Sequence, residues 1–187
     1  MAETLVAYRQ AQASDAEAIA ALHADSWQRN YRGAYSDAFL DGDVFADRLA
    51  VWTSRLRAPG RDTHTVVAEA DERIVGFGHT ILDADTKWGA LVENLHVTHN
   101  RRGDGIGTQL LARSAQAATA GSSPGLFLWV LEQNTAAQTF YQRRGGVRVE
   151  QQLVQPPGGI AGRLAGAPAS FRYVWTDPSE LEVWLAS

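Results

Sequence analysis

The stretch LHVTHNRRGDGIGTQLL, residues 95–111, joins a strand-like apolar segment to a helix-like segment through two arginines and three spaced glycines. A strand that ends near Val97, followed by a turn and a helix from about Gly105, leaves several backbone N–H groups unpaired at the start of the helix. The helix dipole is positive at that end. This order of elements predicts a site for an anion.

The residue types in the turn favour a phosphate. Glycines at 103, 105 and 107 let an anion approach the backbone where a Cβ would block it, and Arg101 and Arg102 can add charge-assisted hydrogen bonds. The dipole alone contributes about 0.3 to 2 kcal/mol, so several amides and an arginine must act together.

Two common nucleotide-binding patterns do not match the stretch. The dinucleotide pattern G-x-G-x-x-G fails because Thr108 stands where the last glycine is required, and no G-K-[S/T] follows for a P-loop. The stretch instead reads R-x-x-G-x-G from Arg102 to Gly107.

Composition narrows the class of protein. The chain has 187 residues, 45% of them apolar and 20% charged, which indicates one globular domain. A formal net charge of -4 argues against a general nucleic-acid binder. The absence of cysteine excludes disulfides, thiolate-bound zinc and a cysteine nucleophile. Neither a signal-peptide pattern nor an apolar run of 18 residues is present, so we expect a cytoplasmic protein without a membrane partner.

The hydrophobic periodicity predicts a mixed α/β domain without internal repeats. A capping box at Ser14 and Glu17 opens the first helix, and Gly42 and Asp43 interrupt the second helical region. The expected strands are 5–11, 63–70, 74–82, 88–97, 125–131, 147–155 and 170–176, and the expected helical regions are 14–27, 36–56, 105–121, 134–145 and a short one at 177–185.

With these elements placed, the chain resembles the GNAT superfamily of acyl-CoA-dependent N-acyltransferases. The family signature Q/R-x-x-G-x-G/A follows a strand, as Arg102 to Gly107 does here. The later segment NTAAQTFYQRRGG, residues 134–146, is similar to the family pattern N-x-x-A-x-x-F-Y-x-x-x-G. The resemblance covers about residues 5–155. His99 stands where proline is frequent, and Gly146 replaces an aromatic residue, which we expect to leave more room at the mouth of the site.

The resemblance implies one α/β (α+β) acetyltransferase domain over residues 1–187. Its central sheet is expected to be mixed but mostly antiparallel, with about seven strands flanked by helices and splayed between the fourth and fifth strands. The Gly/Pro-rich segment 156–169 should be a loop, acting as a lid or merely slack, and 177–187 a C-terminal tail.

The resemblance also implies that acetyl-CoA lies between the strand that ends at Val97 and the strand at 125–131. Acetyl-CoA is the expected co-substrate, and no bound metal is expected. The implied cofactor-binding residues are Leu95, His96, Val97, Arg101, Arg102, Gly103, Asp104, Gly105, Ile106, Gly107, Thr108, Asn134, Ala137 and Phe140.

Two residues are the candidates for catalysis. Tyr141 matches the family tyrosine that hydrogen-bonds the departing thiolate, and its alternative role is an aromatic packed beside Phe140. Full proton transfer from a phenol near pKa 10 to a thiolate near 8.5 costs roughly 2 kcal/mol, which favours hydrogen bonding. Glu93 is the candidate base, with Asp25 or a water chain as alternatives, and it could equally be a salt-bridged strand residue. Strand alternation predicts that Glu93 shares a face with Leu95 and that His96 points the other way.

The acceptor site is expected near the first helices. Trp27, Tyr31 and Tyr35 either form an aromatic wall for the acceptor or only pack the first helix onto the sheet. We expect direct transfer of an acetyl group to the primary amine of a small molecule in a ternary complex. A protein or peptide N-terminal or lysine acetyltransferase and a non-catalytic acyl-CoA-binding module are the alternatives. A homodimer fits the family, and no nucleic-acid partner is expected.

Overall fold

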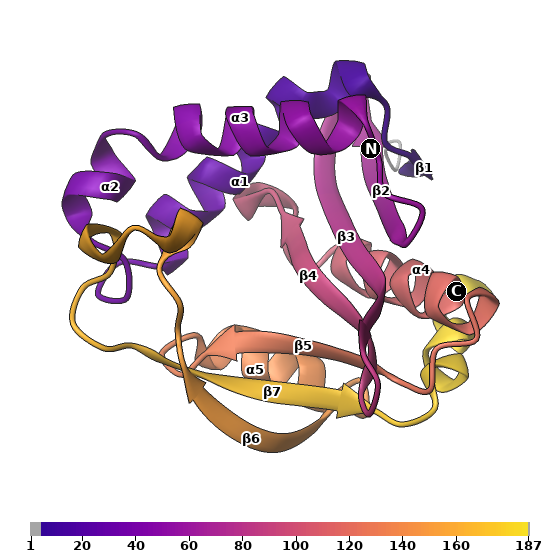
Figure 1. Ribbon diagram of the computed structural model, residues 1–187. Helices are drawn as coiled ribbons and strands as arrows, with labels where there is room; N and C mark the ends of the chain where they lie inside the picture. The colour runs from indigo at the N-terminus through magenta and orange to yellow at the C-terminus, as the bar shows by residue number, and fades with distance from the viewer. Residues whose placement is uncertain (1–4, 187) are drawn as a thin grey trace.

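The computed structural model describes residues 5–186 and contains one seven-stranded sheet (Figure 1). The strand order is β1-β2-β3-β4-β5-β7-β6, and all neighbours are antiparallel except β4 and β5, which are parallel. This confirms the expected mixed, mostly antiparallel sheet. The strands are β1 (Ala7–Gln10), β2 (Thr63–Ala70), β3 (Arg73–Asp85), β4 (Gly89–Val97), β5 (Leu126–Leu131), β6 (Val147–Leu153) and β7 (Ala169–Trp175).

Helices cover both faces of the sheet. Phe77 of β3 packs against Trp52 on the α1/α3 side, whereas a Cβ at Gly76 would meet Leu110 of α4 on the other side. None of the helices within residues 5–186 is long and apolar enough to cross a membrane. The helices are α1 (Ala16–Asn30), α2 (Asp37–Asp41), α3 (Val44–Arg57), α4 (Ile106–Ala120) and α5 (Thr135–Gln142), and the 3₁₀ turns are η1 (Ala13–Asp15), η2 (His99–Arg101), η3 (Pro157–Gly159), η4 (Ala161–Arg163) and η5 (Pro178–Ala186).

The start of α1 differs from the sequence prediction. The capping box at Ser14 and Glu17 is wrong, because η1 precedes the helix and Asp15 takes the capping position. The Asp15 carboxylate accepts a hydrogen bond from the Gln12 backbone N–H at 2.7 Å and pairs with Arg9 of β1 at 2.7 Å. The ion pair with Arg9 therefore helps to fix Asp15 at the start of α1.

The sheet splays between β4 and β5, as expected. These strands pair only at Ala90 with Leu126 and at Leu91 with Phe127. Beyond Leu91 they diverge, so the edge of β4 that runs on to Val97 has no partner strand on this side. Its backbone N–H and C=O groups remain available to a ligand.

Gly146 does not widen the mouth of the site, so that hypothesis is wrong. A Cβ at Gly146 would lie 2.7 Å from the indole ring of Trp175. The indole Nε1 of Trp175 donates to the Arg144 carbonyl at 2.7 Å, which fixes the ring in place. Trp175 of β7 fills the space that an aromatic residue at 146 would need.

The Gly/Pro-rich loop is neither structureless nor slack. It contains η3 and η4 and lies beside α2 (Figure 1). The Ser36 backbone N–H, just before α2, donates to the Arg163 carbonyl at 3.0 Å, and the Arg163 guanidinium pairs with Asp47 of α3 at 2.5 Å. These contacts fasten the loop to α3 and to the start of α2.

Candidate active site

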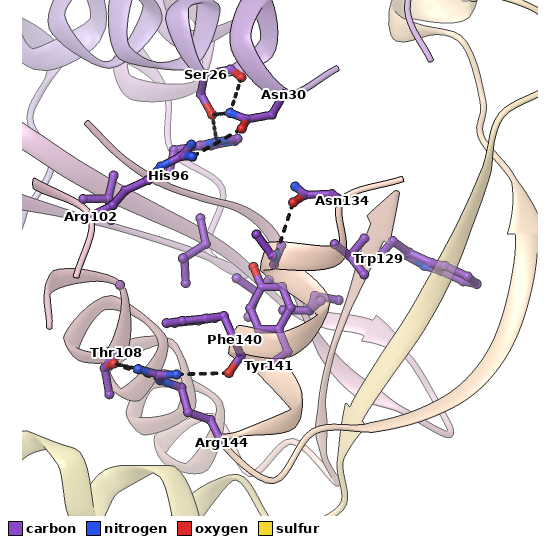
Figure 2. A pocket seen from close by; sticks show the side chains of 18 of the residues that line it. Ser26, Asn30, His96, Arg102, Thr108, Trp129, Asn134, Phe140, Tyr141 and Arg144 are labelled. Carbon is purple, nitrogen blue, oxygen red and sulfur yellow. Dashed lines mark hydrogen bonds between the residues drawn. The ribbon is translucent and has the colours of Figure 1, made fainter. Parts of the chain in front are cut away.

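A cavity of about 330 Å³ opens at the splay and gathers most of the predicted site residues (Figure 2). It lies between α1, the exposed edge of β4, the glycine-rich loop, β5 and α5. The predicted residues that line it are Tyr31, Glu93, Leu95, His96, Val97, Arg101, Arg102, Gly103, Gly105, Gly107, Thr108, Asn134, Ala137, Phe140 and Tyr141. Four others, Trp27, Tyr35, Asp104 and Ile106, are not among the lining residues.

The glycine-rich loop presents free amides to this cavity. Gly103 and Gly105 have φ values of 97° and 81°, which favour glycine, and a Cβ at either position would point into open space. Within the described residues, the backbone N–H groups of Gly103, Gly105, Ile106 and Gly107 make no hydrogen bond. The start of α4 therefore has the unpaired donors that an anion requires.

Gly107 has a different reason to be glycine. A Cβ there would lie 3.3 Å from the Phe140 ring, so the missing side chain lets α5 approach α4. The Gly107 amide remains free and lines the cavity, so its use by an anion stays a prediction. The Ile106 side chain is buried in the core, and only its amide can serve a ligand.

The two arginines of the loop are held in different ways. Arg101 Nε pairs with Asp104 at 2.6 Å, so the Asp104 side chain positions an arginine and lies outside the cavity lining. Arg102 Nη1 donates to Asn30 Oδ1 of α1 at 3.3 Å. Both arginines line the cavity and supply positive charge beside the free amides.

Helix α5 supplies the opposite wall. Asn134 caps the helix as predicted, its Oδ1 accepting from the Ala137 backbone N–H at 3.2 Å, so this oxygen is already engaged by the helix. Figure 2 shows Tyr141 pointing from α5 into the cavity, with its hydroxyl toward the side formed by α1 and β4. Burial raises the pKa of the Tyr141 phenol well above its ordinary value, which keeps it protonated.

Glu93 does not share a face with the apolar residues that follow it on β4, so that prediction is wrong. Asn94 pairs with His79 of β3, but the next pair involves Val92, which leaves Glu93 as the extra residue of a β-bulge. Its carboxylate lies 2.5 Å from the guanidinium of Arg55 on α3 and accepts from Asn94 Nδ2 at 2.9 Å. Glu93 still lines the cavity, on the side of α3.

His96 points away from Leu95, as predicted, and faces α1. Its Nδ1 lies 2.8 Å from Ser26 Oγ, and its ring centroid is 4.6 Å from that of buried His23. Burial and nearby arginine charges lower the pKa of His96 to about 3, so the ring is neutral near pH 7. Residues 5–186 contain no group of three or more His, Asp or Glu placed to hold a metal ion.

The aromatic wall is reduced to one residue. Tyr31 lines the cavity, and burial raises its pKa to about 12. Trp27 and Tyr35 are buried in a core cluster with Phe39, so these two residues pack in the core and do not form a wall of the cavity. Their rings lie 5.6 Å and 5.0 Å from the Tyr31 ring by centroid and hold it in place.

Sequence reasoning missed eight lining residues, namely Ser26, Asn30, Val92, Leu128, Trp129, Val130, Ala136 and Arg144. Ser26 and Asn30 lie one helical turn apart and therefore share a face of α1. The spacing indicates a site only when it is known which face of α1 meets the sheet. Arg144 stands inside the quoted segment 134–146, but its contact with Thr108 joins two helices and no local pattern indicates it.

Comparison with known proteins agrees with this geometry. Residues 61–145, which run from β2 through the glycine-rich loop to α5, match the family model described as acetyltransferase (GNAT) domain. The uncharacterized N-acetyltransferase YuaI of Bacillus subtilis (strain 168) is 26% identical over 151 residues, which cover 79% of this chain and 83% of that protein.

Two solved structures share the fold. The PaiA N-acetyltransferase of Thermoplasma acidophilum, in complex with coenzyme A, superposes with a TM-score of 0.69 at 17% identity and covers 91% of this chain and 99% of its own. Nourseothricin acetyltransferase gives a TM-score of 0.63 at 22% identity and covers 91% and 98%.

Proposed function

We propose that this chain, which carries a GNAT acetyltransferase domain, transfers the acetyl group of acetyl-CoA to the primary amine of a small molecule. The observation that supports the proposal most strongly is the set of free amides at Gly103, Gly105, Ile106 and Gly107, beside the edge of β4 that the splay exposes. A phosphate group fits the amides, and an extended chain fits the open strand edge.

The residues present fit coenzyme A. We assign its diphosphate to the free amides of the glycine-rich loop together with Arg101 and Arg102, and its pantetheine arm to the β4 edge near Leu95 and Val97. Bound acetyl-CoA supplies the acetyl group as an activated thioester. The chain has no cysteine, so no thioester forms on the protein, and the proposal is direct transfer from cofactor to amine in one ternary complex.

Two side chains have proposed roles in the reaction. As the amine nitrogen bonds to the acetyl carbon and the carbon–sulfur bond breaks, the Tyr141 hydroxyl donates a hydrogen bond to the departing sulfur. Its raised pKa supports donation of a hydrogen bond and opposes complete proton transfer. Glu93 accepts the proton that the amine loses, directly or through water. The Glu93 carboxylate lines the cavity while it pairs with Arg55 of α3 at 2.5 Å, which fixes its position.

The surroundings of the cavity support a small acceptor. The rings of Trp27, Tyr31 and Tyr35 contact one another, and the loop that contains η4 is fastened to α3 through Asp47. A peptide substrate would need an open groove beside these elements.

Binding and turnover test the proposal separately. Calorimetry with acetyl-CoA should give heat with the natural chain and much less with Gly105→Ala. Gly166→Ala is the control, because Gly166 also has a positive φ and open space but lies in the loop outside the cavity lining. A panel of small amines and peptides should then release free thiol with a small amine. Absence of heat overturns the proposal, heat without turnover identifies a non-catalytic binding module, and turnover of peptides alone identifies a peptide acetyltransferase.

A further inference from the structure

One partly buried guanidinium lines the cavity without an acidic partner in the described part of the chain. Arg144 follows α5, and its Nε donates to Thr108 Oγ1 of α4 at 2.8 Å, while its Nη1 donates to the Phe140 carbonyl at 3.0 Å. No ion pair within residues 5–186 includes Arg144. A cation that is partly removed from water and lacks a counter-charge favours an anionic ligand.

The guanidinium is held ready for a ligand. It lies over the Phe140 ring, 3.7 Å from the ring centroid, and also donates from Nη2 to Thr108 (Figure 2). A guanidinium has five N–H donors, and these contacts use three, so one N–H on each Nη nitrogen remains. Because the group is already fixed by stacking and hydrogen bonds, little side-chain entropy is lost when it binds an anion.

The position of Arg144 separates it from the donors already assigned to the diphosphate. Those donors are the amides up to Gly107 and the loop arginines, whereas Arg144 comes from α5 and reaches α4 at Thr108, beyond the last free amide. Besides its diphosphate, coenzyme A carries a phosphate monoester on the ribose. We propose that Arg144 binds this ribose 3′-phosphate and so makes the chain distinguish coenzyme A from dephospho-coenzyme A. The inference rests on the proposed use of the cavity for coenzyme A.

A matched control exists on the other side of α4. Arg113 also stacks on an aromatic ring, 4.1 Å from the centroid of Tyr8, and donates to the α4 side chain Gln109 at 2.8 Å. Burial lowers the pKa of Arg113, as it does that of Arg144. Arg113 does not line the cavity.

Calorimetric titration of coenzyme A and dephospho-coenzyme A into the full chain tests the inference. We expect the natural chain and the Arg113→Gln variant to bind coenzyme A roughly tenfold or more tightly than dephospho-coenzyme A, which is the effect of one charge-assisted contact. The Arg144→Gln variant should bind coenzyme A more weakly, with an affinity within about twofold of that for dephospho-coenzyme A. Its affinity for dephospho-coenzyme A should be unchanged. Arg144→Lys, which keeps the charge without the fork, should retain part of the preference and serves if the glutamine variant does not fold.

Three results would overturn the inference. Equal weakening of both ligands by Arg144→Gln would show that Arg144 acts on the diphosphate or only on the α4–α5 contact. An unchanged preference in both Arg144 variants would show that the ribose phosphate lies elsewhere. Failure of the natural chain to bind either ligand would overturn the proposed function itself, and this appears before any variant is compared.

Discussion

At the scale of single residues, the environment of Tyr141 decides which chemistry its hydroxyl can perform. If Tyr141 donates a hydrogen bond to the departing sulfur as proposed, replacing it with Phe removes a contact worth about 1.5 to 3 kcal/mol in the transition state. We expect kcat to fall roughly tenfold to a hundredfold while KM for acetyl-CoA changes little. Steady-state kinetics with an acceptor amine would measure this.

Tyr173→Phe is the matched control for Tyr141. Tyr173 is a buried tyrosine of the same core cluster, and its hydroxyl accepts from Gln142 Nε2 at 3.2 Å, but it does not line the cavity. This variant should keep the natural kcat. If both variants turn over equally, Tyr141 is only a packed aromatic.

Glu93 is the second residue whose role a substitution can decide. If it accepts the amine proton, Glu93→Gln should lower kcat/KM by about 10²-fold or more and change the pH–rate profile, because general bases contribute 10² to 10⁴. Glu69→Gln is the control, since Glu69 is also a strand glutamate ion-paired with an arginine, and its side chain is 31% exposed against 33% for Glu93. A pH–rate profile that both variants leave intact would make Glu93 a structural ion pair with Arg55.

At the scale of elements, local patterns predicted most of what the structure contains. Alternating apolar residues gave the strands, and Asn134 and Gly121 marked the ends of helices, because these signals depend on neighbours in the chain. The β-bulge at Glu93 and the filling of space at Gly146 by Trp175 depend on residues far apart in the sequence. A single extra residue in β4 moved a candidate base to the other face of the sheet, and no spacing rule within the strand could indicate it.

The loop between β6 and β7 gives a prediction at this scale. Arg163 joins the loop to α3 through a partly buried ion pair with Asp47, but the loop does not line the cavity. We expect Arg163→Gln to lower the free energy of unfolding by about 1 to 3 kcal/mol, between the values for exposed and buried pairs. KM for the acceptor should stay unchanged. Urea unfolding and kinetics on the same variant would test both parts, and a raised acceptor KM would show that the loop acts as a lid.

At the scale of the whole molecule, α1 connects the glycine-rich loop to β4 across the cavity. Arg102 donates to Asn30, the Asn30 amide donates to the Ser26 carbonyl at 2.7 Å, and the Ser26 hydroxyl meets His96 of β4. These contacts tie the proposed diphosphate site to the strand that would hold the thioester. Buried Ser26 and half-buried His96 meet at the centre of this arrangement, beside buried His23, and the two histidines make the stability of the molecule sensitive to acid.

The lowered pKa values of His23 and His96 are the source of that sensitivity. The His23 Nδ1 accepts from Trp52 Nε1 at 3.0 Å and burial lowers its pKa well below 6.5, while that of His96 is lowered to about 3. Below pH 6.5 the unfolded chain therefore binds more protons than the folded chain, and the free energy of unfolding falls as pH decreases toward 3. Between pH 7.5 and 5, His96 alone should cost about 2 kcal/mol, at 1.36 kcal/mol per pH unit below 6.5.

Urea unfolding at pH 7.5 and pH 5 would measure this loss. His96→Gln should make the stability less dependent on pH by about 2 kcal/mol over that interval, because the variant has no imidazole to protonate on unfolding. His99→Gln, which replaces an exposed histidine two residues after β4, should keep the natural dependence. If His96→Gln and the natural chain lose the same stability on acidification, His96 is protonated in the folded state, and a neutral ring between Ser26 and His23 is the wrong description of this part of the cavity.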